Sequence, residues 1–274
     1  MKRLIDWEEL WENQMGRSSW SKNDELWWDR RSEEFDRRMK TNEYIEKMIA
    51  KIDPKPESTV LDVGCGPGTL AIPFAKRVKS VTALDMSKMM LQFVMKNARS
   101  EGLTNITCLQ RRWEEVTVGR NLKPHDLVIC SRSFPERSPW HTLYQLNSAA
   151  RKCVYITMWA NGDEYETFYQ SIYRNIGKEY RPPPDYIYVY NMLYQEGILA
   201  NVEFIEYTDH LQYSDIDATM QDWMWRIRPE NKDQENRLNH YLLKQFAKNK
   251  NSKMEKRLKC RWALIWWKKG EVNE

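Results

Sequence analysis

The chain has 274 residues, and its 43 Lys and Arg residues against 39 Asp and Glu residues give a formal net charge of +4. So mild a charge gives no support for a dedicated nucleic-acid binder, and no apolar run approaches the ~18 residues that a membrane span needs. Because the first eight residues lack an apolar signal segment, and because neither the five cysteines nor the four histidines show metal-ligand spacing, we expect a cytoplasmic protein without membrane, metal or disulfide framework.

The first 52 residues predict helices. Apolar and aromatic side chains recur there at helical spacing in three stretches. These are Leu4, Trp7, Trp11 and Met15, then Trp28, Phe35 and Met39, then Ile45, Met48, Ile49 and Ile52. Pro54 and Pro56 end this zone. We therefore predict an N-terminal helical cap segment at residues 1–52, followed by one domain at 53–274.

Residues 58–157 alternate short β-branched runs with helical patterns. The predicted strands are 59–63, 80–84, 105–109, 126–130 and 153–157. Leu70, Phe74 and Val78 mark a helix after the first strand, and Ser87 can cap a second helix after the next strand. This alternation predicts right-handed crossovers and a parallel sheet.

Beyond residue 158 the pattern loosens. Helical stripes are predicted at 165–176, 186–197, 216–227 and 238–246, strands at 202–207 and 260–267, and an exposed helix and loop at 244–259. The connections around 158–200 and 208–259 exceed what a simple crossover needs, so we expect them to be cap insertions. The predicted fold is a Rossmann-like, mostly parallel seven-stranded sheet with helices on both faces, plus helical cap elements from the N-terminal segment and the C-terminal half.

Three of the ten glycines, Gly64, Gly66 and Gly68, lie within five residues where the first strand meets the first helix. Glycine lets the backbone turn sharply and approach a ligand closely. Asp85, at the end of the second strand, is placed where an acid can bind both hydroxyls of a ribose. A dinucleotide fingerprint would need glycine in place of Thr69, and the Gly-Lys-Ser/Thr of a P-loop is absent.

This spacing, Asp62-x-Gly64-x-Gly66-x-Gly68 with an acid at Asp85, resembles that of the class I S-adenosylmethionine-dependent methyltransferases. The likeness covers about residues 58–157 and is greatest to the small-molecule branch that resembles the quinone-ring methylases. It implies S-adenosyl-L-methionine as cofactor. By this resemblance the cofactor would lie against Asp62, Gly64, Cys65 and Gly66 at its methionine end, Asp85 at the ribose, Met86, Arg112 and Trp113 at the adenine, and Ser131 at the methyl group.

One position departs from the family pattern. The usual acid that accepts the adenine amino hydrogens is matched here by Arg112, which has no acceptor atom in its side chain. The amino group must then find a backbone carbonyl or another side chain. Cys65 and Cys130 are expected to fill the core rather than to act as nucleophiles.

The chain is rich in rings, with 13 Trp, 14 Tyr and 7 Phe. We expect some of them to form a closed aromatic pocket for a small acceptor, although any single ring on a helical stripe is more simply core. Such rings could also hold a cationic amine or the sulfonium by cation–π attraction. The candidates for the acceptor pocket are Trp20, Arg132, Trp159 and Trp225.

The predicted function is therefore methyl transfer from S-adenosylmethionine to a small-molecule acceptor. No catalytic residue is singled out, because transfer from a sulfonium needs alignment and exclusion of water more than a strong base. Two alternatives stay open: a methyltransferase directed at RNA or protein, and a non-catalytic S-adenosylmethionine-binding protein. Ser131-Arg132-Ser133-Phe134 replaces the Asn-Pro-Pro-Tyr type of motif, which argues against amide or exocyclic-amine methylation.

Overall fold

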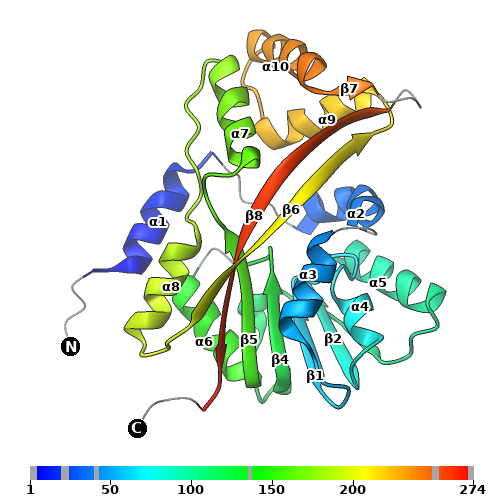
Figure 1. Cartoon of the computed structure of the whole chain (residues 1–274), viewed down its shortest axis with the longest axis vertical. Coiled ribbons are helices and arrows are strands. Elements are labelled where there is room, and N and C mark those ends of the chain that lie inside the picture. Colours follow the sequence, from blue (N-terminus) through cyan, green and yellow to red (C-terminus); the bar gives the residue numbers. More distant parts are fainter. Residues whose placement is uncertain (1–4, 20–24, 40–42, 135–137, 249–252, 271–274) are drawn as a thin grey trace.

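A mixed β-sheet of seven main strands forms the centre of the molecule (Figure 1). The computed structural model describes residues 5–19, 25–39, 43–134, 138–248 and 253–270. The strands are β1 (Thr59–Val63), β2 (Ser80–Asp85), β3 (Ile106–Gln110), β4 (His125–Ser131), β5 (Ala150–Trp159), β6 (Asn201–Tyr213) and β8 (Met254–Lys268), with the two-residue β7 (Ala247–Lys248) paired to β8.

The strand order β3-β2-β1-β4-β5-β8-β6 confirms the predicted Rossmann-like, mostly parallel sheet. Strands β1 to β5 pair in parallel, and β8 runs antiparallel to both of its neighbours, β5 and β6. The chain therefore builds outward from β1 in one direction and from β4 in the other. A ligand is expected at the carboxyl ends of these two strands, where the order reverses.

Helices cover both faces of the sheet (Figure 1). They are α1 (Trp7–Arg17), α2 (Glu25–Met39), α3 (Glu43–Ile52), α4 (Ala71–Ala75), α5 (Lys88–Ser100), α6 (Pro139–Ala149), α7 (Glu164–Asn175), α8 (Tyr186–Gln195), α9 (Ile216–Ile227) and α10 (Lys232–Gln245), with a 3-10 turn at Trp113–Glu115. Buried side chains of α3, α4 and α5 share one hydrophobic core, and those of α1, α6 and α8 share a second.

Strand β4 shows how one strand serves both cores. Leu127 and Ile129 belong to the first core, whereas Val128 and Cys130 belong to the second. Successive side chains of a strand point to opposite faces, so a strand covered on both sides is apolar throughout. This explains why the central strands appear in the sequence as continuous β-branched runs.

Strands β6 and β8 are longer than predicted. They pair from Asn201 with Trp266 to Tyr213 with Met254, whereas β5 pairs with β8 only as far as Trp159 with Trp262. Beyond that point the two strands continue as a ribbon against α7 and α9, and α10 packs on those two helices, in the upper part of Figure 1. The segment between β6 and β8 is thus residues 214–253, shorter than the cap insertion expected at 208–259.

Two other local predictions can be compared with the structure. Ser87 caps α5 by accepting the backbone N–H of Met90 at 3.1 Å, as predicted. The helix expected around 70–78 is only five residues long, although Leu70, Phe74 and Val78 are all buried as its stripe requires. No helix in the described ranges is long and apolar enough to cross a membrane.

Candidate functional site

The turn after β1 is shaped by glycines that no other residue could replace without strain. Gly64, Gly66 and Gly68 have φ of 67°, 54° and 92°, in the left-handed region that favours glycine. A Cβ on Gly64 would lie 2.4 Å from the Cβ of Ser133. The turn after β4 therefore packs directly onto the glycine turn, and only a residue without a side chain permits this approach.

Asp62, the last polar residue of β1, carries a carboxyl group that is 2% exposed. It accepts a backbone hydrogen bond from Ala71, but its Oδ2 has no hydrogen-bond partner among the described residues. Burial, followed by the nearby charge of Asp85, raises its pKa to about 7. A buried acid with a spare oxygen is suited to a cationic hydrogen-bond donor.

Asp85 lies at the end of β2 and faces the same turn. Its Oδ2 accepts the N–H of Gly66 at 2.9 Å, and its Oδ1 accepts the N–H of Ser87 at 2.8 Å. Burial raises its pKa, and these backbone bonds oppose that rise. The backbone of Met86 also bonds to this carboxylate, which still has acceptor capacity for a hydroxyl group.

The three residues predicted at the adenine also cluster. The Arg112 Nη1 lies 3.6 Å from the sulfur of Met86, and its Nη2 lies 3.6 Å from a carboxylate oxygen of Glu25. Trp113 follows as a buried ring in the second core, and its Nε1 lacks a hydrogen-bond partner within the described residues. Arg112 is thus a half-buried cation in contact with the sulfur of Met86.

Helix α2 covers this part of the site, which the sequence did not reveal. Its Asp29 Oδ1 accepts hydrogen bonds from the Ser87 hydroxyl at 2.5 Å and from the Met89 N–H at 3.2 Å. A Cβ on Gly66 would lie 3.8 Å from the Phe35 ring. The helical spacing of its rings predicted an amphipathic helix, but spacing carries no information about where that helix docks.

Three hydroxyl groups meet at the carboxyl ends of β4 and β5. The Tyr44 hydroxyl from α3 lies 2.7 Å from the Ser131 Oγ and 2.8 Å from the Thr157 Oγ1. Tyr44 is fully buried, and burial raises its pKa even though the charge of Arg132 acts to lower it. Ser131, predicted near the methyl group, is therefore held by a neutral hydroxyl network.

Arg132 extends from the same edge of the sheet. Its φ is 56°, and its backbone N–H donates to the Thr157 Oγ1 at 3.0 Å. Its guanidinium carbon lies 4.3 Å from the centroid of the Tyr44 ring and 5.9 Å from that of the Trp262 ring. Tyr44 and Trp262 were not predicted as site residues, since neither belongs to a motif.

The other acceptor-pocket candidates are spread apart. Trp159 ends β5 as a buried ring, 5.2 Å from Trp262 and 5.7 Å from Tyr165 between centroids. Trp225 lies on α9 with 40% of its surface exposed, two positions from the fully buried Trp223 and thus on the other side of that helix. Trp20 lies outside the described residues.

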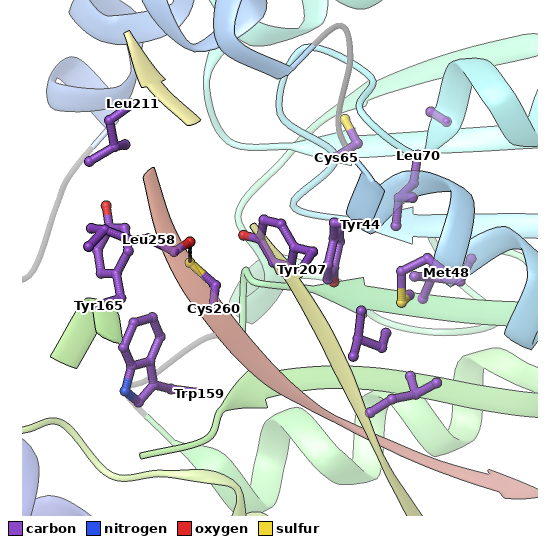
Figure 2. Close-up of a cluster of buried hydrophobic side chains, with 14 of the residues drawn as sticks. Tyr44, Met48, Cys65, Leu70, Trp159, Tyr165, Tyr207, Leu211, Leu258 and Cys260 are labelled. Carbon is purple, nitrogen blue, oxygen red and sulfur yellow. Dashed lines mark hydrogen bonds between the residues drawn. The ribbon is translucent and has the colours of Figure 1, made fainter. Parts of the chain in front are cut away.

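Most rings of the C-terminal half pack as core. Tyr165, Phe168, Tyr169, Tyr173 and Trp223 are all buried, in the same hydrophobic core as Trp159. Figure 2 shows Trp159 beside Tyr165, and Tyr44 of α3 beside Tyr207 of β6, whose ring centroids are 5.5 Å apart. The Arg132 guanidinium thus lies near the rings of Tyr44 and Trp262, from α3 and β8, and Tyr207 of β6 packs against Tyr44.

The arrangement fits the cofactor that the motif implies. A buried, partly satisfied acid at Asp62 suits the amino group of a methionyl moiety, and Asp85 suits the hydroxyls of a ribose. Gly64 and Gly66, in the turn between them, carry no side chain, so the backbone itself can approach a ligand. These residues lie at the ends of β1 and β2, beside the reversal in strand order.

Comparison with known proteins also indicates a methyltransferase domain. The family model described as "Methyltransferase domain" matches residues 60–154, the part of the chain from β1 into β5. An uncharacterised protein of Haemophilus influenzae is 29% identical over 234 residues, which cover 83% of this chain and 82% of that protein. A ribosomal RNA small subunit methyltransferase A of Wigglesworthia glossinidia brevipalpis is 35% identical over 68 residues, which are 25% of this chain and 26% of its own.

The fold is also similar to that of solved structures. The crystal structure described as a putative methyltransferase of Bacillus halodurans aligns with a TM-score of 0.57 at 15% identity. The alignment covers 82% of this chain and 98% of that one. The likeness extends well past residue 154, so most of the chain belongs to one architecture.

Proposed function

We propose that the chain, which carries a methyltransferase domain at residues 60–154, is a class I S-adenosylmethionine-dependent methyltransferase that methylates a small-molecule acceptor. The proposal is carried by one observation: the residues predicted to bind the cofactor and those predicted near the acceptor lie at the same edge of the sheet. Asp62 and Asp85 face the glycine turn, and Ser131 and Arg132 follow the adjacent strand β4. The donor and the acceptor can therefore meet at the reversal in strand order.

On the donor side, we assign Asp62 to the amino group of the methionyl part and Asp85 to the ribose hydroxyls. The backbone of Gly64 to Gly66 would pass close to the cofactor between them, and Met86 would pack against the adenine. Bound S-adenosylmethionine supplies an electrophilic methyl group. The residues hold it in place and leave the carboxyl end of β4 open to the acceptor.

On the acceptor side, the hydroxyl groups of the chain orient the acceptor rather than deprotonate it. Ser131 and Thr157 share hydrogen bonds with the Tyr44 hydroxyl, whose raised pKa keeps it protonated at neutral pH. These groups can orient an acceptor atom by hydrogen bonding and keep water away from it. We place the acceptor against Arg132 and the Trp262 ring, with Trp159 behind them.

Two observations favour a small acceptor over RNA. The net charge of +4 is modest for a surface that must bind phosphates. The sequence likeness to the ribosomal RNA methyltransferase is confined to a quarter of the chain.

The acceptor class can be tested directly. The purified chain is incubated with methyl-labelled S-adenosylmethionine and separate fractions of a cell extract: dialysable small molecules, RNA and protein. We expect label in the dialysable fraction. Label that appears only in RNA or only in protein would contradict the proposal, and binding of the cofactor without transfer to any fraction would favour a non-catalytic role.

Asp85→Asn provides the matching loss-of-function variant. Both oxygens of the Asp85 carboxylate now accept a backbone N–H. In the asparagine variant an NH₂ group would face one of these N–H donors, and the negative charge that strengthens the bonds to the ribose would be lost. At ~1.5–3 kcal/mol for each charged hydrogen bond lost, affinity for S-adenosylhomocysteine should fall at least ~tenfold in isothermal titration. Asp233→Asn, on the exposed surface of α10, is the control and should leave affinity unchanged.

A further inference from the structure

Strand β3 forms one edge of the sheet, and no described segment pairs with its outer side. Its hydrogen bonds to β2 include backbone groups of Asn105 and Arg111. Alternate residues of a strand direct their backbone groups to opposite sides, so the N–H and C=O groups of Ile106, Cys108 and Gln110 point away from β2. No hydrogen bond within the described chain reaches these outward groups.

The other open edges of the sheet are closed by side chains. On the outer side of β6, Lys47 of α3 donates to the Glu206 carbonyl at 2.6 Å. Where β8 extends beyond the end of β5, the Lys259 N–H donates to a carboxylate oxygen of Glu164 at 2.9 Å. An unpaired edge is a template for another strand, and side chains that occupy its backbone groups prevent such pairing. Among the described residues, β3 has no such protection.

A groove of about 550 Å³ runs beside this open edge, between β3 and helix α5, which lies at the right of Figure 1. Leu91, Met95 and Cys108 give it an apolar surface. Three exposed cations also line it: Lys88, Lys96 and Arg99. No acid is among the lining residues, and no carboxylate of the described ranges forms an ion pair with these cations. The groove therefore favours an anionic occupant with some apolar surface.

The chemistry of the groove distinguishes between anionic and other occupants. A second copy that paired through β3 about a twofold axis would place the same cations opposite one another, which is unfavourable. Single-stranded nucleic acids are held largely by stacking on aromatic rings, and none of the lining residues is aromatic. An extended peptide can bond to the free backbone groups of β3, and acidic side chains on it can pair with the cations.

We propose that the groove between β3 and α5 binds an acidic segment of another protein, which adds to β3 as an extra strand. Lys88 and Lys96 are eight residues apart on α5, about 12 Å along its axis. Strand residues four positions apart share one face and are about 13 Å apart. The segment that fits best therefore has acids at the first and fifth positions of a five-residue stretch. An apolar residue at the third position would contact Leu91 and Met95.

Fluorescence polarisation with labelled peptides tests the charge preference. One peptide has the central sequence Glu-Thr-Val-Thr-Glu, and the other has Lys in place of both Glu. We expect the wild type to bind the acidic peptide at least ~tenfold more tightly than the basic one. Lys96→Glu should lose this preference. Lys232→Glu, the same change of charge at an exposed site on α10, should keep it. Circular dichroism and thermal unfolding show that each variant is folded.

Methylation of the peptide backbone tests strand addition and leaves the protein unchanged. Methyl groups are placed on the nitrogens of the first, third and fifth positions of the acidic stretch, or on those of the second and fourth. Only one of these two sets faces β3 in an added strand. One methylated peptide should therefore bind like the parent, and the other at least ~tenfold more weakly. In nuclear magnetic resonance spectra, the parent peptide should shift the amide signals of Ile106, Cys108 and Gln110.

The same measurements can overturn the proposal. Equal affinity of the wild type for the acidic and basic peptides would contradict it, as would a Kd above ~1 mM for both. Equal effects of the two methylation patterns would exclude strand addition. A single-stranded oligonucleotide that binds the groove more tightly than the acidic peptide would assign it to nucleic acid. A wild-type dimer whose β3 amides are protected from hydrogen exchange would assign the edge to a second copy.

Discussion

The carboxyl group of Asp62 makes cofactor binding depend on pH. Its pKa of about 7 in the cofactor-free protein means that it is largely protonated near pH 6. A methionyl ammonium group beside it would favour the charged form, so binding near pH 6 should release a proton. Affinity should then rise with pH up to about 7, by at most ~tenfold per pH unit, and level off above it.

Isothermal titration of S-adenosylhomocysteine in two buffers with different heats of ionisation measures that proton directly. Asp62→Asn removes the titrating group and should remove the release. Undiminished proton release in this variant would show that another group is responsible.

The same shift affects the stability of the cofactor-free protein. An acid whose pKa is higher in the folded chain than in the unfolded chain binds protons more tightly when folded. The free energy of unfolding should therefore be greatest at acidic pH with respect to this group, and should fall between about pH 4 and 7 by at most ~1.4 kcal/mol per pH unit. Urea unfolding of wild type and Asp62→Asn across this range should show a flatter profile in the variant.

Position 64 requires both a positive φ and the absence of a Cβ, and among the amino acids only glycine satisfies both. With φ at 67° and Ser133 only 2.4 Å from the site of a Cβ, Gly64→Ala should destabilise the chain by about 2–4 kcal/mol and abolish tight cofactor binding. Gly16→Ala is a matched control, because nothing lies within 4 Å of its would-be Cβ and it belongs to helix α1. That change should instead stabilise by up to ~1 kcal/mol. Equal thermal unfolding of the two variants would contradict this account.

At the scale of elements, α2 joins the cofactor turn to the upper part of the molecule. Asp29 bonds to the start of α5, and Arg31 forms an ion pair with Asp222 of α9. Asp222 is buried and is also bound by Arg226 and by the Tyr213 hydroxyl, both within hydrogen-bond distance. Burial by itself would raise the pKa of Asp222, but Arg226 and Arg31 lower it below the ordinary value.

Arg31→Gln should release α2 without unfolding the chain. Because Asp222 keeps its ion pair with Arg226, the free energy of unfolding should fall by only about 1–3 kcal/mol. Asp222→Asn leaves both Arg31 and Arg226 without their carboxylate, and should lower the free energy of unfolding by about 3–5 kcal/mol. Hydrogen exchange should accelerate in α2 of Arg31→Gln, and S-adenosylhomocysteine should dissociate faster. Lys232→Gln breaks an exposed pair and should change neither. Unchanged exchange in α2 would contradict a holding role for Arg31.

The elements also show where sequence patterns succeed. The predicted strands β1 to β5 agree with the structure because their apolar runs are flanked by turn residues; those of β1, β2, β4 and β5 are mostly buried, and only the edge strand β3 is half-exposed. Residues 254–259 are mostly charged and were expected as helix and loop, but they form the start of β8. Pairing with β6 decides their conformation, and strand formation depends more on the partner than on the residue.

At the scale of the whole molecule, only part of the site can be predicted from the sequence. Asp62, the glycines and Asp85 follow a local spacing, which fixes their place at the strand ends. Asp29, Tyr44 and Trp262 come from α2, α3 and β8, and no spacing rule relates them to the motif. They reach the site only because the sheet order brings β5 and β8 together and because α2 and α3 fold back over it.

Strand β8 has a consequence for how the protein is made. It lies between β5 and β6 in the sheet, yet Trp262 is synthesised roughly 100 residues after its partner Trp159, a delay of about 5–20 s at ordinary translation rates. Among the described strands, β6 pairs only with β8, so its long apolar alternation emerges from the ribosome without a partner. Until β8 follows, that strand is the part of the nascent chain most open to chaperones or to pairing with another chain.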